Sequence, residues 1–92
     1  MGEASKGTES VLRERFSQNL VKARKQAGLS QEELANMCSI HRTEVSLLER
    51  EGREPRLGTL TKLAFALGVP REELCAGIEW DVKRHRFKQK RG

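Results

Sequence analysis

The sequence predicts an all-α domain of five helices, followed by an extended or hairpin-like basic arm at the C-terminus. Apolar residues recur at helical spacing through most of the chain. The two prolines, Pro55 and Pro70, lie between the periodic segments rather than inside them. The 92 residues suffice for one domain, whose thin core makes every apolar position count.

Helical periodicity predicts five helices, at residues 9–27, 31–37, 41–50, 57–67 and 71–76. The first ends at Gly28, because glycine adopts the left-handed conformation at no steric cost. Ser30 and Glu33 have the Ser-x-x-Glu spacing of a capping box, so the second helix opens there. The third has only Val45 and Leu48 as inward anchors, so it needs neighbouring helices to be stable.

The spacing of apolar residues changes after the fifth helix. Ile78, Trp80 and Val82 alternate with acidic residues, and Phe87 is placed to pair across a turn, which predicts a hairpin or an extended arm. Together, Leu74, Ile78, Trp80 and Val82 would give a small monomer more apolar surface than it needs, which favours a dimer interface. Alternatively, they fold back on their own core. Trp80 is more typical of a packing anchor than of a base-stacking platform.

The net charge of +5 lies at the C-terminal end. The last ten residues hold six of the 18 basic residues and none of the 13 acidic ones, so residues 1–82 have a net charge of −1 (12 against 13). The basic end is either a solvated tail or an arm that contacts phosphates through Lys83, Arg84, Arg86 and Lys88. We therefore expect a disordered leader at 1–8, a domain at 9–77, and an arm with a basic tail at 78–92.

Several protein classes are disfavoured. There is no apolar run of membrane-spanning length, and the first ten residues lack the apolar stretch of a secretory signal. Cys38 and Cys75 fall on expected apolar helix faces without zinc-ligand spacing, so we expect buried free thiols in a reducing cytoplasm. No nucleophile with a base partner, paired-carboxylate pocket or metal cluster is evident. We expect no enzyme activity, cofactor, metal or small-molecule ligand.

Residues 31–50 have the pattern of a helix-turn-helix: two short helices joined by a tight turn, the second with a polar first turn. The major groove of DNA admits one helix, and side chains of its first two turns reach base edges. The N-terminus of the preceding helix can direct amides at a phosphate. This pattern predicts binding to double-stranded DNA.

Three segments resemble the Cro/lambda-repressor (Cro/CI-like) family of helix-turn-helix domains: GLSQEELA at 28–35, HRTEVSLLE at 41–49 and LGTLTKLAFALGV at 57–69. The resemblance covers about residues 12–76, and the HRT run is especially similar to restriction–modification controller proteins. It implies a lambda-repressor-like five-helix fold. It also implies a transcriptional regulator, such as a repressor, of bacterial or phage origin that binds a palindromic operator as a homodimer.

The resemblance also implies roles for single residues. Base reading would fall to Arg42, Thr43, Ser46 and Leu47, and phosphate contacts to Gln31, Arg53 and Arg56. From its place at the start of the third helix, His41 is either an N-cap or a phosphate contact. Arginine can fork onto guanine and the threonine methyl can meet thymine, whereas Leu47 offers apolar contact alone. Glu44 either turns away from phosphate or accepts from cytosine N4, and Glu49 is expected to be structural.

One position departs from the family pattern. Glu51 stands where the family usually has glycine, and a glycine follows at Gly52. We therefore expect either a third helix that is one residue longer or a left-handed turn shifted along the chain.

A second hypothesis is a protein-interaction module, antitoxin-like or adaptor-like, that docks a partner through the fifth helix and residues 78–82. The near-neutral body favours it. The dependence of binding affinity on salt concentration distinguishes the two hypotheses, because DNA binding weakens steeply as salt rises and apolar association does not.

Overall fold

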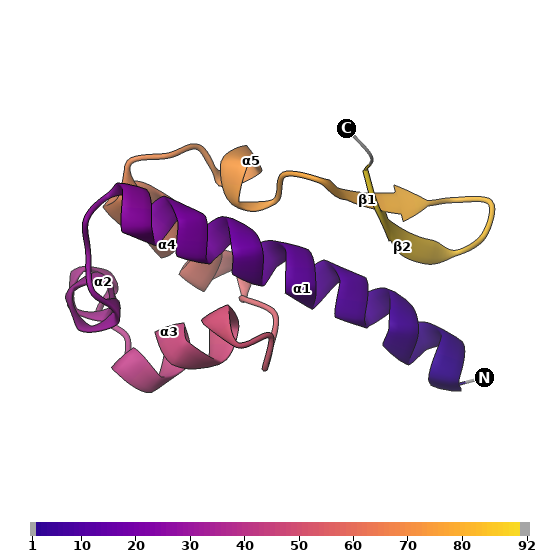
Figure 1. Ribbon diagram of the computed structural model, residues 1–92, viewed down its shortest axis with the longest axis horizontal. Helices are drawn as coiled ribbons and strands as arrows, with labels where there is room; N and C mark the ends of the chain where they lie inside the picture. Colours follow the sequence, from indigo (N-terminus) through magenta and orange to yellow (C-terminus); the bar gives the residue numbers. More distant parts are fainter. Residues whose placement is uncertain (1, 91–92) are drawn as a thin grey trace.

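The computed structural model describes residues 2–90, with side chains from Glu9 onward, as five helices and a small antiparallel sheet (Figure 1). The elements are α1 (Gly2–Gln26), α2 (Gln31–Cys38), α3 (Arg42–Glu49), α4 (Leu57–Leu67), α5 (Arg71–Leu74), β1 (Ile78–Asp81) and β2 (Arg86–Gln89). The five expected helices are confirmed. The class is mostly helical rather than all-α, because the C-terminal segment forms a hairpin.

The first helix begins earlier than its apolar pattern indicated. α1 starts at Gly2, whereas the periodic residues that predicted a helix from Glu9 begin with Val11. Periodicity marks only the part of a helix that packs, while each further residue adds one more backbone hydrogen bond. The leader expected at 1–8 therefore overlaps α1. Its side chains, and Met1 altogether, lie outside the described residues.

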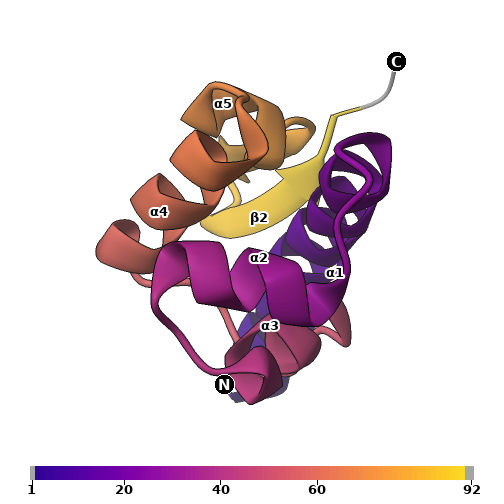
Figure 2. The same cartoon turned by 90° about the vertical axis from the view of Figure 1, so that its left-hand side faces the viewer.

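The core forms where α1 crosses the other helices (Figures 1 and 2). Phe16, Leu20 and Ala23 line the buried face of α1 at helical spacing. The largest side chains in the core with no exposed surface are Leu20, Leu34, Val45, Leu48, Leu63 and Leu74. Fully burying one such side chain contributes about 1.5–3 kcal/mol, so these few residues account for much of the stability of a small domain.

The helix-turn-helix begins at the capping box that the sequence predicted. The Ser30 hydroxyl accepts a hydrogen bond from the Glu33 amide at 3.0 Å, and the Ser30 amide donates to Glu33 Oε1 at 2.8 Å. α2 ends at Cys38, and the C-cap residue Ser39 has a left-handed backbone (φ 55°) that turns the chain toward α3. Both ends of α2 are thus set by local interactions, which fix the direction in which the chain enters α3.

The C-terminal hairpin packs on α1. Asn19 Nδ2 donates to the carbonyls of Leu74 and Ala76, each at 2.9 Å, and Arg15 Nε donates to Ala76 O at 3.1 Å. Gly77 has a φ of +84°, and a Cβ there would lie 2.6 Å from Arg15 Nε, so the approach depends on glycine. In Figure 1 the hairpin lies on one side of α1 and α3 on the other.

The hairpin has the cross-strand pair that the alternation suggested. Trp80 lies opposite Phe87, with ring centroids 5.0 Å apart in an edge-to-face arrangement. Asp81 caps the turn, since its Oδ1 accepts from the amides of Lys83 and Arg84. The hydrogen bond from the Arg84 amide is the main cause that lowers the pKa of Asp81 below its usual value.

Leu74 has no exposed surface, so the second alternative holds for it: it folds back on the core of its own chain and is not available to a dimer partner. The expectation that both cysteines are buried is wrong for one of them. Cys75 is exposed rather than buried, because α5 ends at Leu74 and the residue after it does not continue the inward face. Cys38 is buried as expected, and burial raises the pKa of its thiol. Ile78 is partly buried against the core.

The left-handed turn after α3 falls on Glu51. α3 ends at Glu49, Arg50 caps it, and Glu51 has a φ of 66°. Neither expected alternative is right: the helix is not longer, and the turn does not shift to Gly52. A Cβ on Gly52 would lie 3.1 Å from Leu47 Cδ2, so Gly52 is kept small by packing. Glu51 therefore adopts a conformation that costs an L-residue about 1–2 kcal/mol.

We expect Glu51→Gly to raise the free energy of unfolding by about 1 kcal/mol. Glycine relieves the backbone strain of the folded state, and the greater conformational entropy of the unfolded chain offsets part of that gain. Urea denaturation of the two proteins measures the change. Glu51→Ala is the control, since alanine keeps the Cβ. Equal stabilisation by glycine and alanine would show that lost charge, and not backbone strain, is responsible.

The end of α3 is held by a nearly buried ion pair to α1. Arg24 Nε donates to Glu49 Oε2 at 2.6 Å and Nη2 to Glu49 Oε1 at 3.1 Å, with side chains only 13 % and 5 % exposed. The hydrogen bond to Glu49 is the main cause that raises the pKa of Arg24. Arg24 Nη1 also donates to Leu29 O at 2.8 Å, and the Ser17 hydroxyl donates to Glu49 O at 2.6 Å. The C-terminal end of α3 is thus fixed to α1.

We expect Glu49→Gln to lower the free energy of unfolding by about 3 kcal/mol, because it leaves the Arg24 charge buried without its counter-ion. Glu79→Gln, which breaks the exposed Lys88–Glu79 contact of 3.9 Å, should cost less than about 1 kcal/mol. Thermal unfolding followed by circular dichroism compares them. Similar losses in the two variants would contradict a central role for the Arg24–Glu49 pair.

Candidate nucleic-acid interface

The first turn of α3 presents its side chains to solvent. Arg42 and Thr43 are exposed, and the α3 helix packs through Val45 and Leu48, which have no exposed surface. His41 is the N-cap residue, and its exposed side chain makes no capping hydrogen bond. The structure thus leaves the side chains of all three residues accessible to an external ligand.

A groove of about 630 Å³ lies between the start of α3 and the start of α4. It brings together five of the predicted site residues, which come from separate stretches of the chain. The lining residues are Ser39, Ile40, His41, Thr43, Glu44, Leu47, Arg53, Arg56 and Thr59. This lining combines cations, a carboxylate, hydroxyls and one apolar side chain, a mixture that suits hydrogen bonding to a polyanion with polar edges.

The second turn of α3 is less accessible than the first. Ser46 and Leu47 are both half-buried, and Leu47 packs against the loop at Gly52. The Leu47 carbonyl also accepts the Gly52 amide at 2.7 Å. Leu47 therefore has a structural part in closing the loop after α3, which gives a physical reason for an apolar residue at this position.

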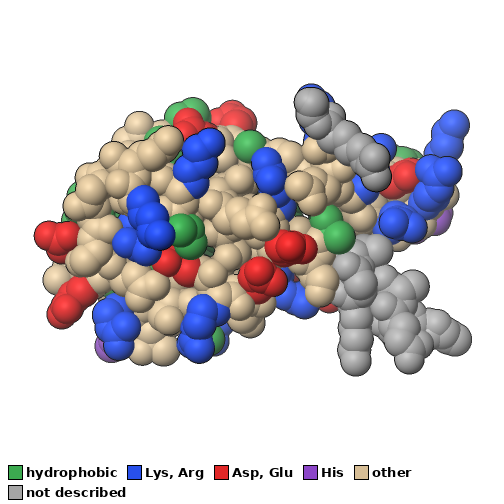
Figure 3. Space-filling model, viewed as in Figure 1, with side chains coloured by type: hydrophobic (Ala, Val, Ile, Leu, Met, Phe, Trp, Pro, Cys, Tyr) green, Lys and Arg blue, Asp and Glu red, His purple; other side chains and the backbone are tan. Residues whose placement is uncertain are grey.

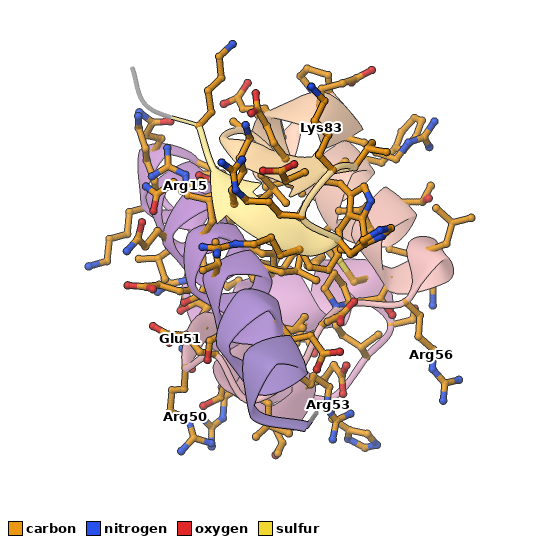
Figure 4. The ribbon with its side chains drawn as sticks, turned by 90° about the vertical axis from the view of Figure 1, so that its right-hand side faces the viewer. Arg15, Arg50, Glu51, Arg53, Arg56 and Lys83 are labelled. Carbon is orange, nitrogen blue, oxygen red and sulfur yellow. The ribbon has the colours of Figure 1, made fainter. Side chains whose placement is uncertain are left out.

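Three arginines form a basic rim beside the groove, at Arg50, Arg53 and Arg56. All three are exposed, and Figure 4 shows them along one edge of the molecule. Arg53 Nη1 donates to Glu44 Oε1 at 2.8 Å, which ties the loop to the first turn of α3. Arg50 was missed in the sequence, although the spacing of three residues between these arginines was a signal for it.

The Gln31 side chain joins the start of α2 to the end of α3. Its Nε2 donates to Glu49 Oε1 at 2.9 Å, so the carboxylate that binds Arg24 also binds the first residue of α2. Glu49 has the structural role that was expected, and the partners of its carboxylate are side chains of α1 and α2. The two helices of the motif and α1 are thereby joined at one carboxylate.

The basic hairpin is not part of this surface. Figure 1 shows it across α1 from α3, and Figure 4 shows Lys83 near the edge opposite the arginine rim. Two of its cations have partners in the hairpin itself, Arg84 with Asp81 at 3.0 Å and Lys88 with Glu79 at 3.9 Å. Figure 3 shows a group of basic side chains at the hairpin end and others scattered over the rest of that face, with carboxylates among them. Trp80 and Val82 are 49 % and 72 % exposed here.

Over residues 2–90, no helix is both long and apolar enough to cross a membrane. Among the side chains that the structure describes, from Glu9 to Lys90, no three His, Cys, Asp or Glu residues are grouped as metal ligands would be.

A family model described as "Helix-turn-helix" matches residues 20–74. A "Neisseria hypothetical transcription factor" from Neisseria meningitidis is 41 % identical over 66 residues, 72 % of this chain and 62 % of that protein. The "Control protein C.BamHI" of Bacillus amyloliquefaciens is 42 % identical over 48 residues, 52 % of this chain and 59 % of its own length. The chain thus spans about three fifths of these two curated relatives.

A solved structure gives a match that covers more of the other protein. The restriction–modification controller protein C.AhdI from Aeromonas hydrophila superposes with a TM-score of 0.65 at 39 % identity, over 67 % of this chain and 94 % of that one. The segment matched by the family model exceeds half of the chain and contains α2 and α3, whose geometry is that of the motif. The chain therefore belongs to the helix-turn-helix family.

Proposed function

We propose that this protein binds specific sites in double-stranded DNA by inserting the first turn of α3 into the major groove. The accessibility of Arg42 and Thr43, on a helix anchored at its other end by the Arg24–Glu49 pair, is the observation that carries the proposal. Arginine can fork onto guanine O6 and N7, and the threonine methyl fits beside a thymine methyl. Ser46 and Leu47, both half-buried, have a smaller part.

Phosphate contacts would lie on both sides of the first turn of α3. Gln31 is the first residue of α2, where free backbone amides and the helix dipole favour a phosphate. His41, Arg53 and Arg56 line the groove next to α3, and the exposed Arg50 extends the basic rim. Such contacts fix the register of the protein on the duplex, while base contacts at α3 give specificity.

We also propose a homodimer, which would present two recognition helices about 34 Å apart to a palindromic site. With Leu74 buried, the best candidate surface is at α4 and α5, where Phe65 is 79 % exposed beside a groove of about 470 Å³. Trp80 and Val82 of the hairpin are a second exposed apolar pair. Exposed apolar surface of this kind on a small domain favours a protein contact.

Selection of bound sequences from a random DNA pool should give a palindromic consensus. On that site we expect Arg42→Ala to weaken binding by about 1–3 kcal/mol, and by much less on random duplex, because the lost contact is to a base. Fluorescence anisotropy at one fixed salt concentration measures both. Equal losses on the two duplexes would refute base reading by Arg42.

We expect Arg56→Ala to weaken binding equally on all sequences and to reduce the slope of log affinity against log salt by about one, since it removes one phosphate contact. Lys83→Ala removes the same charge from the hairpin, across α1 from the groove, and should leave the slope unchanged. If Lys83→Ala lowers the slope as much as Arg56→Ala, the basic tail is the phosphate-contacting arm and not a solvated end.

A protein-interaction module remains the second candidate. It is favoured by the charge of residues 41–56, where four arginines are balanced by four glutamates. Strong salt dependence of complex formation would favour DNA, and weak dependence a protein partner. The relatives are named as transcription factors and control proteins, which points away from catalysis and agrees with a cytoplasmic location.

A further inference from the structure

The first turn of α3 carries a carboxylate where a DNA-binding surface would be expected to be positive. Glu44 lies in the groove with Thr43 and Leu47, and it is the sole carboxylate among the residues that line it. Its side chain is 25 % exposed, against 51 % for Arg53, its ion-pair partner. Glu44 is thus held in place inside the groove rather than free on the outer surface.

The pair with Arg53 fixes the direction of this carboxylate. Arg53 comes from the loop after α3, and the loop is itself closed by the Gly52 amide and the Leu47 carbonyl at 2.7 Å. One guanidinium nitrogen, Nη1, holds Glu44 Oε1 at 2.8 Å. A guanidinium has five N–H donors, so Arg53 can keep this contact and still donate to a phosphate.

An ionised carboxylate accepts hydrogen bonds and cannot donate them. In the major groove, guanine offers acceptors and thymine offers an acceptor and a methyl group, so neither satisfies Glu44. Adenine offers an N6 amino donor, but its N7 acceptor lies beside that donor and repels a carboxylate, whereas cytosine presents its N4 amino group with no acceptor of its own beside it. Arg53 holds Oε1, so the other carboxylate oxygen, Oε2, would be desolvated and repelled by the nearby phosphates if the base pair brought it no donor.

We propose that Glu44 is a specificity-determining residue that requires a cytosine amino group in each half-site, and that Arg53 is its positioning residue. This rests on the proposed binding of α3 in the major groove. Glu44 then acts mainly by exclusion: it lowers affinity for every site that lacks the donor. Binding to random DNA is weakened, and the contrast between specific and non-specific sites is increased.

The test is selection from a random duplex pool with the full chain and with Glu44→Gln. The wild type should select cytosine at one position of each half-site, and replacing that cytosine should weaken binding roughly 5- to 150-fold. Glu44→Gln should lose this preference, because an amide both donates and accepts. It should also bind random duplex more tightly, and the other positions of the consensus should be unchanged.

Glu54→Gln is the matched control, since Glu54 is exposed in the same loop and makes no ion pair or side-chain hydrogen bond among the described residues. It changes the charge equally, so it should raise non-specific affinity and leave the consensus intact. Arg53→Met should broaden the cytosine position, and Arg53→Lys should restore it in part. Circular dichroism confirms that each variant is folded.

The outcomes separate this inference from the function on which it rests. A wild type that selects no sequence would overturn the proposed function. A palindromic consensus that Glu44→Gln leaves unchanged, or that has guanine, thymine or adenine where Glu44→Gln acts, overturns the role of Glu44 alone. Loss of the cytosine preference in both Glu44→Gln and Glu54→Gln would show a general charge effect and also overturn it.

Discussion

The Arg24–Glu49 ion pair is the interaction on which the geometry of the recognition surface depends. α3 is only eight residues long, and a helix of that length is not stable by itself in water. Two buried side chains, Val45 and Leu48, fix its distance from the core and leave rotation about its axis less well determined. The bidentate contact between a planar guanidinium and a planar carboxylate removes that freedom. Gln31 adds α2 to the same carboxylate.

This arrangement divides α3 into two ends with different tasks. The C-terminal end is anchored by nearly buried polar contacts, and the N-terminal end carries exposed side chains. A nearly buried ion pair is a weak source of net stability, because desolvation cancels much of its attraction. Its value here is orientational, since a displacement at the anchored end would move Arg42 and Thr43 relative to any base pair that they read.

Much of the helical body could be predicted from the sequence, because its signals are local. The Ser30–Glu33 capping box and the apolar spacing in α4 each depend on residues within a few positions, and both are confirmed. The start of α1 was missed because its first residues have no apolar period to mark them. The exposure of Cys75 followed from a helix end that no capping residue marked.

The candidate site was harder to predict, because its contacts join distant parts of the chain. A structural role for Glu49 was expected, but its pairing with Arg24 across 25 positions has no local signal. Arg53 and Glu44 are only nine positions apart, but a loop lies between them and no local pattern predicts their contact. The position of the basic tail was also beyond sequence reasoning, since composition gives its charge and says nothing about the side of α1 on which it lies.

The seat of the hairpin on α1 has a consequence for the order of folding. β2 is the last element that the structure describes, and it packs on the first helix. During synthesis, the residues of α2, α3 and α4 emerge before those of β2, so these helices can assemble on α1 first. The part of α1 that the hairpin covers has to wait for a contact between residues far apart in the sequence. Packing of β2 on α1 is therefore the closing step of the fold described here.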